Sequence, residues 1–201
     1  MKTVIAKALF NSHSYLEYRK LVSDLLTEGK STGHEQTEEL THYSKLNDTR
    51  MNRLDKTIKL NDVVLSQMEN LKKEYIWLVI SEGWCGDAAQ ILPIIAQLTT
   101  AARGKIDLKI VLRDENEALM NLFLTHGGKA IPKLIIIDKN TTDVLAHWGP
   151  RPEGAVLLIE DYKKEHGVLD ETIKTNLQLW YLNDKGQAVQ KELVETMLIF
   201  E

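Results

Sequence analysis

The chain has 201 residues, of which 43% are hydrophobic, and a formal net charge of -4 at pH 7. This length can bury a full core and favours one domain with extensions. The negative charge argues against nucleic acid as the main partner, and no apolar run approaches the roughly 20 residues that span a bilayer. Because Lys7 interrupts the first apolar stretch and no convincing cleavage site follows, we expect no signal peptide and a cytoplasmic protein.

The segment before residue 57 is predicted to be helical. A first helix ends near Gly29, since glycine fits the turn that closes a helix. A second helix, from 35 to 56, carries several basic residues, which we interpret as a solvated face; an anion- or partner-binding surface is the alternative. A short edge strand over 57–60 then precedes a helix capped by Asn61 or Asp62.

The single cysteine of the chain lies between a predicted strand and a predicted helix. The run from Ile76 to Ile80 is apolar and rich in β-branched residues, and it breaks at Gly83. A helical pattern extends from Asp87 to Ala102, so Cys85 stands at the helix N-terminus. Backbone N–H groups and the helix dipole at such a position favour the thiolate over the thiol. The sulfur is therefore a candidate nucleophile.

The rest of the core is predicted to form a mixed sheet. Strand, helix and strand in succession imply parallel pairing with a right-handed crossover, and a later hairpin adds an antiparallel pair. The predicted elements are a strand over Ile106–Leu112, a helix from Asp114 to Leu124, hairpin strands Leu134–Ile137 and Val144–Trp148, and a helix from Pro152 to the residue before Gly167.

The tail from Asp170 to Glu201 is predicted to form two helices. We expect these helices and the N-terminal pair to cover one side of the sheet. An exposed Trp180 and Tyr181 would instead mark a partner-binding site.

Two motifs in this order resemble the thioredoxin superfamily. Trp84, Cys85 and Gly86 stand at the strand-to-helix junction, and Pro93 follows eight residues after the cysteine. The second motif runs from Gly127 through Ile131, Pro132 and Lys133 into the next strand, and it resembles the cis-proline loop of that family. Within the superfamily the chain is similar to bacterial single-cysteine proteins with a Trp-Cys-Gly-Asp motif.

The resemblance covers residues 57–164 and implies an α/β fold. We expect a thioredoxin-like mixed sheet flanked by helices, with extra helices at the N- and C-termini. The expected segments are an N-terminal helical extension (1–56), a thioredoxin-like core (57–165) and a C-terminal helical extension (166–201), packed as one globular unit.

The resemblance also implies monothiol redox chemistry. Ala88 occupies the position of the resolving cysteine, and Val79 occupies that of the buried acid, so a conventional dithiol reductase is excluded. Cys85 would act as nucleophile, with release by an external thiol such as glutathione. Asp87 would either raise the pKa of the thiol by its charge, or cap the helix and accept a proton.

The predicted partner-binding residues surround Cys85. By resemblance, the cis bond before Pro132 leaves the backbone of Ile131 free to pair with an extended peptide, while Trp84 and Gly86 flank the sulfur. Lys133 would bind a carboxylate of a glutathione-like molecule; an ordinary surface lysine is the alternative.

Several alternatives stay open. An inert Cys85 thiol in a redox-inactive, protein-binding module fits the sequence equally well. In a third alternative, Cys85 is one ligand of an iron–sulfur cluster in a dimer. The six histidines show no ligand spacing with Cys85, so we expect no zinc site. Arg151, after a stiff Gly-Pro turn, lies at the predicted margin of the site and would reach an anion.

Overall fold

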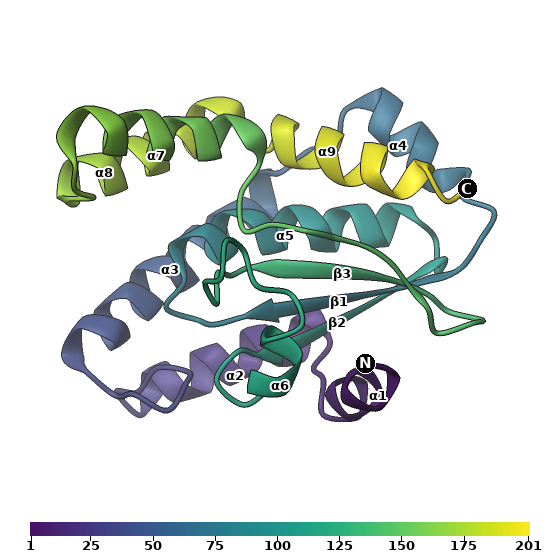
Figure 1. Ribbon diagram of the computed structural model, residues 1–201, viewed down its shortest axis with the longest axis horizontal. Coiled ribbons are helices and arrows are strands. Elements are labelled where there is room, and N and C mark those ends of the chain that lie inside the picture. Colours follow the sequence, from purple (N-terminus) through teal and green to yellow (C-terminus); the bar gives the residue numbers. More distant parts are fainter.

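The computed structural model describes residues 1–201 as a four-stranded mixed sheet with helices on both faces (Figure 1). The strand order is β2-β1-β3-β4. Strand β1 (Tyr75–Ser81) pairs in parallel with β2 (Ile106–Leu112) and antiparallel with β3 (Lys133–Asp138), which in turn pairs antiparallel with β4 (Val144–Trp148). The mixed sheet flanked by helices that the sequence predicts is confirmed.

The helices precede, interrupt and follow the strands in chain order. They are α1 (Lys2–Phe10), α2 (Tyr15–Thr27), α3 (Glu38–Thr57), α4 (Asp62–Glu69), α5 (Gly86–Ala101), α6 (Glu117–Met120), α7 (Glu153–His166), α8 (Glu171–Asp184) and α9 (Gln187–Leu198). None of them combines the length and the apolar character needed to cross a bilayer.

The terminal helices lie on both sides of the sheet rather than on one. Helices α3, α4 and α9 pack against α5 on one face, whereas α1 and α2 pack against β2 on the other (Figure 1). Our expectation of a single covered side is therefore wrong. The reason is that β1 is buried along both faces, so each face needs an apolar layer of its own.

One hydrophobic core connects all parts of the chain. It includes Ile5 of α1, Trp77 of β1, Ile95 of α5 and Met197 of α9. Residues of both terminal extensions thus belong to the same core as the sheet.

Two local predictions are wrong. Residues 58–61 form no strand, because Lys59 and Asn61 direct their backbone groups to the side chain of Gln190 in α9. The helix expected from Asp114 shrinks to the single turn α6, since the Asp114 amide binds a carboxylate oxygen of Glu82 and does not begin a helix.

Gly149 allows the end of β4 to approach the loop before β3. Its φ is +109°, and a Cβ atom there would overlap the backbone carbonyl oxygen of Pro132. Gly104 has a similar φ of +86°, but a Cβ atom there would meet nothing within 4 Å.

We expect Gly149→Ala to lower the free energy of unfolding by about 2 kcal/mol more than Gly104→Ala, because both changes strain φ but only the first forces backbone apart. Denaturant unfolding of the two variants measures the difference. Equal losses would mean that the loop at Pro132 moves freely, contrary to this account.

Candidate functional site

Cys85 is the N-cap residue of α5, directly beyond the end of β1. Its Sγ accepts a hydrogen bond from the Ala88 amide at 3.5 Å, and its thiol donates one to the Ile131 carbonyl at 3.4 Å. The peptide bond between Ile131 and Pro132 is cis. The structure thus brings together the two motifs that the sequence singled out, with the thiol only 8% exposed.

Burial, and to a smaller extent the negative charge of Asp87, raise the pKa of the Cys85 thiol to about 12. Hydrogen bonds from the backbone amides of Ala88 and Asp87, and the charge of Arg151, act in the opposite direction but are smaller. The sequence indicates the helix dipole and the nearby carboxylate, but not the burial. Burial is the largest of these effects, so the surroundings of the sulfur favour the thiol over the thiolate.

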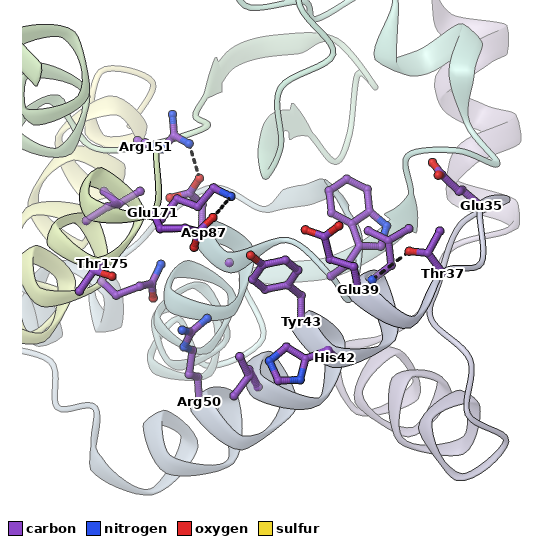
Figure 2. Close-up of a pocket in the computed structure, with 17 residues that line it drawn as sticks. Glu35, Thr37, Glu39, His42, Tyr43, Arg50, Asp87, Arg151, Glu171 and Thr175 are labelled. Atoms are coloured by element: carbon purple, nitrogen blue, oxygen red, sulfur yellow. Dashed lines mark hydrogen bonds and ion pairs between the residues drawn. The ribbon is translucent and has the colours of Figure 1, made fainter. Parts of the chain in front are cut away.

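The carboxylate of Asp87 is held by two side chains from distant parts of the chain. The hydroxyl of Tyr181 in α8 donates to Oδ1 at 2.8 Å. Nη2 of Arg151 lies 2.7 Å from Oδ2, as Figure 2 shows. Asp87 itself is 7% exposed. Burial and the charge of Asp87 raise the pKa of Tyr181, which stays a neutral donor. Both oxygens are occupied, so the carboxylate acts as an anchor for α8 rather than as a free base.

Helix α8 lies over the start of α5. Gln178 accepts a hydrogen bond from Gln90 at 2.8 Å. A Cβ atom on Gly86 would meet the Gln178 amide at 3.4 Å and Arg50 Nη1 at 3.8 Å. The C-terminal extension therefore covers the Trp-Cys-Gly-Asp turn, and Arg50 of α3 approaches it from the other side.

A cavity of about 710 Å³ lies between α3, α8 and the turn that carries the cysteine (Figure 2). Its wall includes Trp84, Gly86 and Asp87, but not Cys85. The remaining polar and aromatic lining comes from the two helices, the segment before α3 and the loop after β4, namely Glu35, Thr37, Glu39, His42, Tyr43, Arg50, Arg151, Glu171, Lys174, Thr175 and Gln178.

Lys133 is not a surface residue, so that alternative is wrong. It is 2% exposed, because β3 is buried along nearly all its length. Its Nζ donates to Thr125 Oγ1 at 2.6 Å and to the Gly149 carbonyl at 2.7 Å, and burial lowers its pKa. The ammonium group thus ties the loop before β3 to the loop after β4, at the open end of the β3–β4 hairpin.

Trp84 is partly exposed at the cavity wall. The guanidinium of Arg113 lies over its ring, 4.7 Å from the centroid, in the geometry of a cation–π contact. Arg113 is itself paired with Asp114 at 2.8 Å. This contact holds the indole beside the cysteine.

The sequence reading missed two buried polar groups near the site. Tyr181 is 4% exposed and binds Asp87, so the alternative in which an exposed Tyr181 marks a partner-binding site is wrong. Glu82 is fully buried; its Oε1 accepts from the Asp114 amide at 3.0 Å, and burial raises its pKa. The burial of Glu82 could have been predicted, because this glutamate directly follows an apolar strand. Nothing in the sequence around Tyr181 indicated its bond to Asp87.

The comparisons with known proteins agree with this geometry. A family model described as "Thioredoxin" matches residues 33–163. The chain belongs to the thioredoxin family. The match begins before α3 and ends in α7, so it includes a helix that the sequence placed in an extension.

Two solved structures are similar to this thioredoxin-family chain. One is a protein of unknown function from Pseudomonas aeruginosa, with 14% identity and a TM-score of 0.54 over 92% of this chain and 97% of that one. The other is an HIV epitope scaffold, with 15% identity and a TM-score of 0.58 over 94% of this chain and 100% of that one. At these sequence identities, the two similarities show only that the fold is shared. No curated protein matches the sequence.

We expect Asp87→Asn to lower the pKa of Cys85 by about one unit or more. The change removes a nearby negative charge and leaves the positive charge of Arg151 without its partner. The pH dependence of Cys85 alkylation measures the shift. Asp107→Asn is the matched control, since Asp107 is paired with Lys139 at the opposite end of the strands. An unchanged or higher pKa in Asp87→Asn would contradict the assigned role of the charge.

Proposed function

We propose that this thioredoxin-family protein binds a partner non-covalently and that Cys85 is a neutral thiol without disulfide turnover. The observation that carries the proposal is the hydrogen bond from the thiol to the Ile131 carbonyl, within a site where the sulfur is buried. Resemblance to the family assigns that carbonyl to a partner peptide. Here it is occupied by the sulfur.

The protonation of Cys85 supports the same conclusion. Thiol–disulfide exchange requires a thiolate with access to the partner sulfur. Because burial raises the pKa of Cys85 far above neutral pH, the fold favours the thiol over the thiolate. Ala88, which is buried, offers no second thiol to release a mixed disulfide.

Monothiol exchange is the second candidate, and one observation favours it. Sγ accepts the Ala88 amide at the N-terminus of α5 and lies beside the cis bond of Pro132. In this reaction the Cys85 thiolate displaces one sulfur of a partner disulfide. An external thiol such as glutathione then takes the partner sulfur and releases Cys85. Asp87 would tune the thiol, and Trp84, Gly86 and Ile131 would border the partner, whereas the buried Lys133 would support the loop that carries Ile131.

Three further expectations stay predictions: a cytoplasmic location in a bacterium, glutathione as the external thiol, and an iron–sulfur cluster held by Cys85 of two subunits. A colourless protein after anaerobic reconstitution with iron, sulfide and glutathione would remove the last of these.

Alkylation of Cys85 by iodoacetamide, followed as a function of pH, separates the two main candidates. We expect a midpoint above the free-cysteine value of about 8.5 for the folded protein, and a midpoint close to that value after unfolding in urea. Because the same sulfur is compared in both states, the difference reports the fold alone.

A midpoint well below about 8.5, together with mixed disulfides trapped from a cell extract by the wild-type protein and not by Cys85→Ser, would refute the proposal and support monothiol exchange. Equal recovery of non-covalent partners by the wild-type protein and Cys85→Ser is the result that the binding proposal predicts.

A further inference from the structure

Helix α3 presents one continuous stripe to the cavity. Glu39, Tyr43, Leu46 and Arg50 all line it, at the spacing of residues that share one helix face. Glu39 and Arg50 are eleven positions apart, which corresponds to about 16 Å along the helix axis. Figure 2 shows Arg50 at the end near Asp87 and Arg151, Glu35 and Glu39 toward the opposite end, and Tyr43 between them.

The cavity has an uncompensated positive charge at one end. Among the basic side chains that line it, Arg151 pairs with Asp87 at 2.7 Å and Lys174 pairs with Glu171 at 2.6 Å. Arg50 has no carboxylate within ion-pair distance, and its guanidinium donates only to Asn47 Oδ1, at 2.8 Å. A guanidinium carries five N–H donors, so most of those of Arg50 remain available to a ligand.

The other end of the cavity carries a net negative charge, although Lys174 lies close enough to Glu39 for that carboxylate to raise the pKa of the lysine. Glu35 and Glu39 line it, and neither takes part in an ion pair. Lys174 lies 6.0 Å from the Tyr43 ring centroid and contributes positive charge nearby, but its ion pair is with Glu171. The cavity therefore has opposite free charges at its two ends.

The length and charge of the cavity indicate its ligand. An extended chain advances about 3.3 Å per residue, so about five residues cover the separation between Arg50 and Glu39. A carboxylate suits the forked guanidinium, and an extended chain that ends in one also reaches Glu39, whereas an inorganic phosphate would occupy the Arg50 end alone. The wall between the ends contains Tyr43, Trp84 and Leu46, which suit apolar side chains.

We propose that the cavity binds the C-terminal residues of an extended peptide, with its terminal carboxylate on Arg50 and a basic side chain about four residues earlier beside Glu39. The proposal names the ligand of the binding function inferred above. It does not depend on the protonation of Cys85, so its failure would leave the neutral-thiol account standing.

The test uses two pools of N-acetylated peptides about five residues long, each with lysine first and mixed residues after it. One pool has a free C-terminal carboxylate and the other a C-terminal amide. Binding to the full-length protein is followed by the amide NMR signals of Gly86 and Tyr43. We expect saturable shifts with the free-acid pool, and binding at least about tenfold weaker with the amide pool, because the charge-assisted bond to Arg50 is lost.

The matched variants assign the two ends of the ligand. Arg50→Gln should weaken binding of the free-acid pool about tenfold or more, whereas Arg53→Gln on the same helix should not, since Arg53 is exposed and does not line this cavity. Glu39→Gln should weaken binding of the lysine pool but not of a pool with alanine first. The comparison of the two pools on the wild-type protein needs no variant, so it holds even if Arg50→Gln is poorly folded.

Equal affinity of the acid and amide pools would overturn the proposal, as would the absence of any saturable shift up to about 10 mM peptide. Displacement of the free-acid pool by low-millimolar inorganic phosphate would also overturn it, because it would show a general anion site rather than a peptide site.

Discussion

The buried carboxylate of Asp87 is the constraint on which the site depends. A charge removed from water must be paired, and the partners of Asp87 come from the loop after β4 and from α8. This group therefore helps to fix how the C-terminal extension lies against the thioredoxin-family core, together with the Gln90–Gln178 hydrogen bond. Loss of either partner would leave a buried charge uncompensated, and α8 would lose its anchor at the start of α5.

The same charge adds to the effect of burial on the cysteine at the helix N-terminus. The amide of Ala88 reaches the sulfur, but burial opposes ionisation and Asp87 adds to that opposition. In addition, the thiol donates its proton to the Ile131 carbonyl. The features that define the family motif are therefore retained around a thiol whose ionisation the fold opposes. Beside the motif, α3 and α8 form the cavity to which we assign the binding function.

Local patterns in the sequence predicted most of the fold. The strands and the helix after Cys85 follow from apolar runs, helical spacing and glycine breaks, which depend on neighbouring residues only. The burial of Lys133 and Tyr181 was not predictable in this way, because it depends on Thr125, Gly149 and Asp87, which lie far along the chain or become adjacent only after folding. For the same reason the sequence indicated the residues around Cys85 but not the cavity, whose wall combines α3 with α8.

The protonation state of Cys85 in the folded protein tests the central claim most directly. The carbon-13 chemical shift of its Cβ atom distinguishes thiol from thiolate, and it can be followed across pH without any reagent that must reach the sulfur. The account predicts the thiol shift unchanged to about pH 10. A thiolate shift at neutral pH would contradict it and would restore Cys85 as a nucleophile.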